Sequence, residues 1–286
     1  MRQLLILSGK GGTGKTTVAA ALIQLSACMA YADCDVDAPN LHLIMKQDVL
    51  PETKDFYGME KYEIDPENCI GCGLCQDHCR FDAVFKSNDI YEIDPFACEG
   101  CATCEFVCPT HAITPKPNIS GELLFYQSKV AFSTAKLNPG GGNSGLLVTE
   151  VKKQLSKVES KFKIIDGSPG IGCPVIASIS GADLILLVVE PTLSGLSDMK
   201  RIVRTANKFH TPMVAVINKV TDYASGNMAD IRIFCESNNI TLLGTIPYDK
   251  SVSSMINEGK SVIESDCPAG NAIRTLYGKI NERIFE

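Results

Sequence analysis

The stretch Ser8–Thr17, SGKGGTGKTT, decides the fold. It follows the apolar run Leu4–Leu7 and precedes a run from Thr16 to Ala27 with the composition of a helix. A strand, a glycine-rich loop and a helix in this order form a phosphate-binding loop, because backbone N–H groups and the helix N-terminus then point at one anion. The loop lysine reaches the β- and γ-phosphates, and the hydroxyl after it binds Mg²⁺. A plain glycine-rich turn would leave the lysine and the hydroxyl unexplained. We therefore predict a nucleotide site made of Gly11, Gly12, Thr13, Gly14, Lys15, Thr16 and Thr17, with Thr16 also a Mg²⁺ ligand.

Composition narrows the class of protein. The chain has 286 residues, 45% of them hydrophobic, so it can bury one large core or two smaller ones. A net charge of −6 offers no general basic surface for nucleic acid. No apolar run approaches the roughly 18 residues of a membrane span, and the segment before the loop is too short for a signal peptide. We expect a cytoplasmic protein that binds neither nucleic acid nor membrane.

The cysteines indicate metal. Thirteen cysteines in a cytoplasmic chain favour metal binding over disulfides. Eight of them lie between Cys69 and Cys108, inside an internal repeat with a period of 29 residues. Tyr62–Phe85 aligns with Tyr91–Thr114, and the four cysteines of each half are in register. Each half reads C-x₂-C-x₂-C-x₃-C, the spacing of bacterial ferredoxins that hold two clusters.

The repeat also predicts how the ligands divide. Three closely spaced thiolates bind three corners of a cubane, and the other half supplies the fourth ligand. One [4Fe–4S] cluster is assigned to Cys69, Cys72, Cys75 and Cys108, and the other to Cys98, Cys101, Cys104 and Cys79. Zinc is the competing interpretation. Arg80 follows Cys79 where ferredoxins usually have proline, which alters the turn and leaves the ligand spacing intact.

The cysteine-rich segment is strongly acidic. From Glu60 to Thr110 it has eleven acidic and three basic residues, a net charge of −8. Such a charge favours docking to a basic partner surface, although solubility alone is an equal explanation.

The rest of the chain indicates a parallel sheet. Apolar strands are predicted at residues 122–133, 162–166, 184–189, 213–217 and 242–246, and they alternate with helices such as 146–155. This order predicts an α/β fold, a doubly wound parallel-sheet P-loop NTPase. We place this domain at residues 1–58 and 117–286. An inserted bacterial-type ferredoxin module, of the α+β class, occupies residues 59–116.

The form KGGTGKTT at Lys10–Thr17 resembles the deviant Walker A motif of the MinD/ParA/Mrp ATPases, to which the nitrogenase iron protein is related. The resemblance implies that Lys10 reaches the phosphates bound by a second subunit, so a homodimer or a heterodimer with a paralogue is expected. It also implies that Asp35 orients the attacking water, that Asp33 and Asp166 support Mg²⁺, and that Gly170 senses the γ-phosphate. The alternative for this aspartate group is a helix N-cap cluster, with Asp37 or Asn40 capping the helix that follows.

Three further positions are interpreted through related proteins. Asn218 corresponds to a base-contacting residue, and Pro247 begins a loop expected to border the base. Thr221 replaces the aspartate that guanine recognition needs, so ATP is favoured over GTP, with Asp222 one place away. Cys173 has the spacing of a cluster ligand of the nitrogenase iron protein, but a second such cysteine is missing. A small apolar residue that opens the next segment is favoured over a semi-exposed thiol near the dimer interface that binds a metal or a partner.

Three functions follow from these motifs. The leading one is an ATP-hydrolysing protein that passes electrons through two [4Fe–4S] clusters to a redox partner, with ATP and Mg²⁺ as further cofactors. The second is maturation or delivery of metallocofactors to a partner, and the third is spatial positioning as in MinD. MinD ends in a membrane-binding helix. Here the apolar stripe Ile273, Leu276, Tyr277, Ile280 and Ile284 of the last helix (271–285) has a mixed polar face, so we expect it to pack on the sheet.

Overall fold

The computed structural model describes residues 2–87 and 90–284, with side chains up to residue 282. The chain forms two compact units. Unit 1 comprises Met1–Thr53, Leu123–Lys136 and Gly145–Glu286, and unit 2 comprises Lys54–Glu122 and Leu137–Ser144. Unit 2 therefore extends beyond the predicted insert of residues 59–116 at both ends, and it takes in a glycine-rich loop that lies outside the insert.

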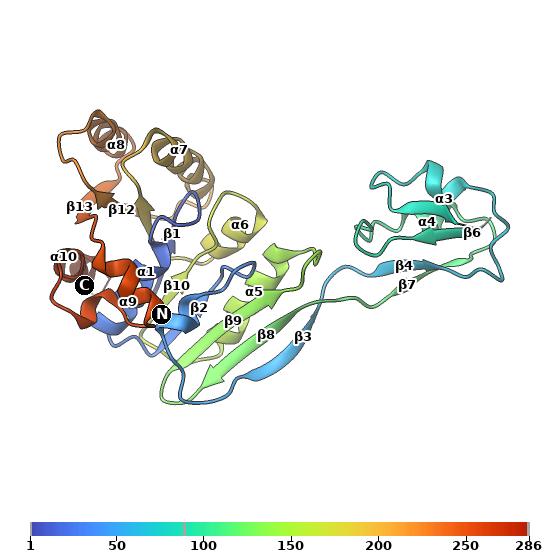
Figure 1. Cartoon of the computed structure of the whole chain (residues 1–286), viewed down its shortest axis with the longest axis horizontal. Coiled ribbons are helices and arrows are strands. Elements are labelled where there is room, and N and C mark those ends of the chain that lie inside the picture. The colour runs from blue at the N-terminus through green and yellow to red at the C-terminus, as the bar shows by residue number, and fades with distance from the viewer. Residues whose placement is uncertain (1, 88–89, 285–286) are drawn as a thin grey trace. The chain divides into compact units, whose positions relative to one another are not determined.

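A nine-stranded sheet, parallel from β13 to β9, forms the centre of unit 1 (Figure 1). Its strand order is β13-β12-β11-β1-β10-β2-β9-β8-β3. β1 lies between β10 and β11, both parallel to it. The strands are β1 (Arg2–Leu7), β2 (Ala30–Asp33), β3 (Glu52–Tyr57), β8 (Ile119–Gln127), β9 (Ala131–Leu137), β10 (Phe162–Asp166), β11 (Leu184–Val189), β12 (Met213–Val220) and β13 (Thr241–Pro247). The ends of the central strands therefore meet at one edge, where parallel α/β sheets bind ligands.

Helices cover both faces of this sheet (Figure 1). Leu4 and Ile6 of β1 point to the core shared with α1 (Lys15–Leu25) and α10 (Pro268–Ile284). The opposite face is covered by α6 (Cys173–Ile179), α7 (Leu193–Asn207) and α8 (Gly226–Ser237), which contact β1, β11 and β13. α5 is Ser144–Ser156, and shorter helices are α2 (Leu41–Ile44), α9 (Ser251–Asn257) and η1 (Val262–Glu264). The predicted doubly wound sheet is confirmed.

Two sequence-based expectations are settled in unit 1. The last helix packs on the sheet as predicted, because Ile273, Leu276 and Ile280 are at most 3% exposed and belong to the core of α1. Ile284 and Phe285 of that helix lie outside the residues whose side chains are described. The prediction of one strand over residues 122–133 is wrong, because two strands, β8 and β9, occupy this part of the chain. The chain turns at Ser128–Val130, which separates β8 from β9. No helix in residues 2–87 and 90–284 has the length and hydropathy to cross a bilayer.

Unit 2 repeats one pattern twice. Its strands and helices are β4 (Lys61–Ile64), α3 (Leu74–Asp77), β5 (Val84–Ser87), β6 (Ile90–Ile93), α4 (Thr103–Val107) and β7 (Ile113–Lys116). The second three elements follow the first three at the 29-residue period. β4 pairs with β7 and β5 pairs with β6, both antiparallel. Each half of the repeat therefore completes its sheets with strands from the other half.

Candidate functional site

The glycine-rich loop joins β1 to α1, and its conformation requires glycine at Gly14. Gly14 has φ +88°, a left-handed conformation, and directly precedes α1. A Cβ atom at this position would lie 2.3 Å from the Asn218 Nδ2 atom. Any side chain at this position would therefore strain the backbone and would also collide with the Asn218 side chain of β12.

A cavity of about 450 Å³ opens at this loop, inside unit 1. It brings together most residues predicted to bind nucleotide. Those that line it are Lys10, Gly11, Gly12, Gly14, Lys15, Thr16, Thr17, Asp35, Asn218 and Pro247. Thr13 lies in a neighbouring smaller cavity against β11 and α7, and Asp33, Asp166 and Gly170 are outside the lining.

A buried charge cluster lies beneath the loop. The Lys15 Nζ donates to Asp166 Oδ1 at 2.5 Å, and both side chains are at most 5% exposed. Burial acts to lower the pKa of Lys15, but the charges of Asp166 and Asp33 outweigh it and raise that pKa. Lys15 is therefore held as an ammonium between carboxylates.

Asp33 serves the backbone as well as the charge cluster. Its Oδ1 accepts the Asp35 N–H at 3.0 Å, and its Oδ2 accepts the N–H groups of Asn40 and Leu41, both at 2.9 Å. Asp33 thus satisfies N–H groups at the start of α2, whereas the sequence pointed to Asp37 or Asn40 as the cap, and the Asn40 side chain makes no capping hydrogen bond. Burial, helped by the charge of Asp166, raises the pKa of Asp33 to about 7.

The site suits a hard divalent cation. Asp166 Oδ2 is buried and has no hydrogen-bond partner among the described residues. Thr16 and Asp35 line the cavity above it, and burial raises the pKa of Asp35. Carboxylate and hydroxyl oxygens are the ligands Mg²⁺ takes in proteins. Thr16 and Asp166 therefore fit Mg²⁺, whereas both oxygens of Asp33 already accept backbone hydrogen bonds.

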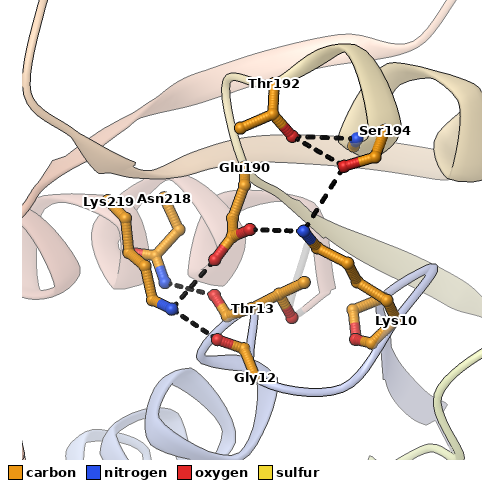
Figure 2. A network of polar contacts seen from close by, with 10 residues as sticks. Lys10, Gly12, Thr13, Glu190, Thr192, Ser194, Asn218 and Lys219 are labelled. Carbon is orange, nitrogen blue, oxygen red and sulfur yellow. Dashed lines mark hydrogen bonds and ion pairs between the residues drawn. The ribbon is translucent and has the colours of Figure 1, made fainter.

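Figure 2 shows a second polar network at the loop. Glu190, which directly follows β11, pairs with Lys10 and with Lys219, each at 2.9 Å. Lys219 Nζ also donates to the Gly12 carbonyl at 2.5 Å. Burial acts to raise the pKa of Glu190, but the hydrogen bonds from Lys219 and Lys10 outweigh it and lower that pKa. Glu190 therefore fixes two lysines against the loop.

Asn218 and Gly170 also bind the loop. Asn218 Nδ2 donates to the Thr13 carbonyl at 2.6 Å, so the side-chain amide supports the loop. Asn218 also lines the cavity. Gly170 has φ +93°, and its N–H donates to the Ser8 carbonyl at 3.1 Å. The segment after Asp166 is thus connected directly to the residue that opens the loop.

Unit 2 contains two cavities lined by cysteines. One, the Cys69 site, is lined by Cys69, Cys72, Cys75 and Cys108. The other, the Cys98 site, is lined by Cys98, Cys101, Cys104 and Cys79. Each is bordered by three cysteines of one repeat and one of the other, which is the predicted division. In residues 2–87 and 90–284, no three Cys, His, Asp or Glu side chains converge on a point that could hold a single metal ion.

The thiols differ in their surroundings. Burial raises the pKa of Cys75, and it raises that of Cys104 to about 11. At Cys108, burial acts to raise the pKa, but hydrogen bonds from the Ala112 N–H, 3.3 Å from Sγ, and from Thr110 outweigh burial. The pKa of Cys108 is therefore lowered. A cubane takes one thiolate per iron, so its ligands surround a cavity and need not meet at one point. Each cavity is lined by four cysteines, the number of thiolates that one cubane would take.

Residues 4–262 match the family described as the CobQ/CobB/MinD/ParA nucleotide binding domain. The chain belongs to this family. A Methanocaldococcus jannaschii protein of uncharacterized function is 36% identical over 99% of this chain and 97% of its own length. A protein named iron-sulfur cluster carrier protein, from Pyrococcus horikoshii, is 24% identical over 99% of this chain and 87% of its own.

Solved structures agree on the fold of this MinD/ParA-type chain. MinD from Pyrococcus horikoshii, solved with Mg-ADP, has a TM-score of 0.59 at 19% identity, covering 99% of this chain and 96% of that chain. MinD from Pyrococcus furiosus also has a TM-score of 0.59, at 20% identity, covering 99% of both chains. The predicted α/β P-loop fold is confirmed.

Sequence reasoning missed Glu190 and Lys219 in this MinD/ParA-type site. Lys219 has φ +57°, which few residues other than glycine adopt, and this conformation accompanies its contact with Gly12. Glu190 belongs to no motif used in the sequence interpretation, and Lys219 lies in the segment Asn218–Thr221 that was compared with the guanine-recognition motif, without a role of its own. The one available signal was a charged residue directly after the apolar run Leu184–Val189.

Proposed function

We propose that the chain is an ATP-hydrolysing iron–sulfur protein, in which a nucleotide-driven dimer switch controls electron transfer through two [4Fe–4S] clusters to a partner protein. The observation that carries this proposal is the lining of the two cavities of unit 2. Each has four cysteines, with three from one repeat and the fourth from the other. The exchange of strands between the repeats, β4 with β7 and β5 with β6, supports the same ferredoxin-like arrangement.

The nucleotide part of the proposal rests on the loop cavity. Lys15, Thr16 and the loop N–H groups bind the phosphates of ATP, and Thr16 and Asp166 hold Mg²⁺, which neutralises phosphate charge. Asp35 lines the same cavity and orients the attacking water. Asp166 bonds Lys15 through Oδ1, and its other oxygen, buried and without a hydrogen-bond partner among the described residues, would support the cation. Membership of the nucleotide-binding family supports this part.

The proposed dimer switch rests on Lys10. Its Nζ lies 2.9 Å from Glu190 and 3.4 Å from the Ser194 hydroxyl. To reach the phosphates of a second subunit, Lys10 must exchange Glu190 for a phosphate, and such an exchange makes dimer formation depend on nucleotide. The second subunit is another copy of this chain or a paralogue.

The cysteine sites provide the electron transfer that the proposed switch controls. When bound, [4Fe–4S] clusters accept and release single electrons. The chain's own residues would hold them by eight thiolates, and the buried side chains of Tyr62, Val84 and Ile113 form one core with Cys75 and Cys98.

The decisive experiment uses the full chain, reconstituted with iron and sulfide without oxygen. We expect about eight irons per chain, since two cubanes hold four each, and reoxidation by a protein acceptor that speeds up at least fivefold with Mg-ATP. Lys15→Ala should abolish the ATP effect. Because Lys15→Ala leaves Asp166 unpaired and buried, Thr16→Ala is the matched second variant, which keeps the Lys15–Asp166 pair. Reoxidation that is indifferent to ATP and to both variants would disprove the coupling.

Cluster delivery is the second candidate. The relatives from Pyrococcus horikoshii and Pyrococcus abyssi named iron-sulfur cluster carrier proteins favour it, at 24% identity. A carrier gives its cluster to an apo-protein, whereas an electron-transfer protein keeps it. Incubation of the loaded chain with an apo-ferredoxin separates the two, because iron retained on the chain contradicts delivery. The third candidate, spatial positioning, is favoured only by relatives named septum site-determining protein MinD, and the burial of α10 argues against a membrane role for that helix.

A further inference from the structure

Two tyrosines mark equivalent places beside the two cysteine sites. Tyr62 and Tyr91 lie 29 residues apart, at the same position of the repeat. Tyr62, in β4, lines the Cys98 site, and Tyr91, in β6, lines the Cys69 site. Each strand therefore serves the site whose other cysteines come mainly from the opposite half of the repeat. The residue before each tyrosine is a matched position, occupied by Lys61 at the Cys98 site and by Ile90 at the Cys69 site.

Lys61 holds the turn that carries the first cysteine of the Cys98 site. Its Nζ donates to the Cys98 carbonyl, and the residue is half-buried. The backbone before it packs on the same turn, because a Cβ at Gly100 would lie 2.4 Å from the Glu60 carbonyl oxygen. The side chain of Ile90 has no donor atom, so the matched position cannot give the Cys69 carbonyl this bond. The lysine contact therefore distinguishes the Cys98 site from its equivalent in the repeat.

Acidic side chains do not separate the two sites. Exposed carboxylates stand near cysteines of each, Glu67 at the Cys69 site and Glu99 at the Cys98 site. Asp77 lies two residues from a cysteine of both sites, and half-buried Glu105 follows a cysteine of the Cys98 site. A count of nearby charges therefore does not rank the sites, whereas the contact of Lys61 belongs to one of them.

The lysine contact has an electrostatic consequence for a bound cluster. Reduction adds one electron, and so one negative charge, to an iron–sulfur cluster. A half-buried ammonium bonded to the backbone of a cysteine ligand favours the reduced form, because a charge there is screened less than one at the surface. Charge and hydrogen bonds around the ligands set the potential of such clusters. The contact should therefore raise the reduction potential at the Cys98 site.

We propose that Lys61 is a positioning residue of the Cys98 site, which fixes the turn of its first cysteine and raises the reduction potential of the cluster bound there. This inference rests on the proposed function, and within it on the binding of one cluster at each site. Reduction takes one electron from an external donor such as dithionite, which is oxidised. No bond forms or breaks, and the Lys61 ammonium keeps its proton.

The test uses the full chain, reconstituted with iron and sulfide and titrated with dithionite in the presence of redox mediators, with electron paramagnetic resonance as the readout. Cys108→Ser leaves four cysteines at the Cys98 site alone, and Cys79→Ser leaves four at the Cys69 site alone. Lys61→Met removes the charge and the donor in each background. Lys116→Met is the matched control, because Lys116 lies opposite Lys61 in the β4–β7 ladder but is exposed and pairs with Glu63.

In the Cys108→Ser background, we expect Lys61→Met to lower the equilibrium constant for reduction about tenfold, a shift of about 59 mV for one electron. In the Cys79→Ser background the same substitution should change this constant less than about twofold, and Lys116→Met should do so in neither background, because exposed charges are screened. Lys61→Arg keeps a charged donor and should restore the value of the unmodified lysine. Equal shifts in the two backgrounds, or equal shifts by Lys61→Met and Lys116→Met, overturn the proposal.

A second variant covers the case in which Lys61→Met loses the iron of the Cys98 site. Lys61→Gln then decides, because it keeps hydrogen-bonding atoms without the charge, and an unchanged potential in Lys61→Gln overturns the proposal. The titration contains no ATP, so its failure leaves the ATP-controlled electron transfer of the proposed function standing. An unmodified chain that holds no iron refutes the proposed function itself, and this inference with it.

Discussion

At the scale of single residues, the charge cluster under the loop predicts an unusual pH dependence. Asp33 has its pKa raised to about 7, mainly by burial. The folded chain therefore keeps a proton that the unfolded chain releases near pH 4, so stability falls as pH rises through 7. We expect this group to cost about 1.4 kcal/mol of unfolding free energy between pH 6 and pH 8. Urea denaturation measures the loss, and a carbon-13 NMR titration that places the Asp33 carboxyl below pH 5 would contradict it.

Glu190 predicts a second residue-scale effect. Glu190→Gln removes the negative charge shared by Lys10 and Lys219. Both lysines are about 40% exposed, so the loss of stability should be modest, about 0.5–1 kcal/mol. If Lys10 acts in a second subunit, its release should tighten the Mg-ATP-dependent dimer severalfold, as measured by analytical ultracentrifugation. Glu150→Gln, which breaks an exposed pair with Lys153, is the control. A dimer weakened by Glu190→Gln would show that Glu190 supports the interface directly.

At the scale of elements, the glycine-rich loop offers a matched pair of substitutions. Gly14→Ala places a Cβ 2.3 Å from Asn218 Nδ2 at φ +88°, so we expect a loss of about 1–3 kcal/mol and at least hundredfold weaker nucleotide binding. Gly11→Ala meets open space, and its φ is not in the left-handed region, so the fold should be unchanged. Thermal denaturation and titration with a fluorescent nucleotide compare the two. Equal stability of both variants would refute the steric argument.

The elements also show what sequence alone can predict. Apolar runs such as Leu184–Val189 become buried parallel strands at the predicted bounds, because a strand covered on both faces must be apolar throughout. The eight cysteines line two cavities in the same two sets that the local spacing assigns to two clusters, and their ligation of clusters stays a prediction. Contacts between distant segments were beyond it, since the chain gives no local signal that Glu190 will meet Lys10, or that Asp33 will cap α2. The turn at Ser128–Val130 was missed because both flanking segments are equally rich in strand-forming residues.

At the scale of the whole molecule, two compact units share one chain that crosses between them several times. The loop at Leu137–Ser144 belongs to unit 2, and α5 begins within it at Ser144. Gly145 in turn packs against Cys173, since a Cβ there would lie 3.0 Å from the Cys173 Cβ. Cys173 begins α6, shortly after the segment that contains Asp166 and Gly170. The chain link from Ser144 to Gly145 and the packing of Gly145 on Cys173 therefore connect the loop in unit 2 to the segment proposed to sense nucleotide.

The division into units predicts that ligand binding in each can be lost separately. Thr16→Ala should reduce ATP hydrolysis at least hundredfold and leave iron content unchanged, because Thr16 lies in unit 1 and unpairs no buried charge. Cys108→Ser should remove about half the iron and leave the ATP affinity of the oxidised chain within twofold. Cys69→Ser should abolish the same electron paramagnetic resonance signal as Cys108→Ser, because both cysteines line one cavity although they come from different repeats. Cys173→Ser, an exposed cysteine outside both cavities, is the control and should alter neither property. If Cys108→Ser instead abolished the signal of the Cys98 site, each repeat would hold its own cluster, and the exchange of ligands between repeats would be wrong.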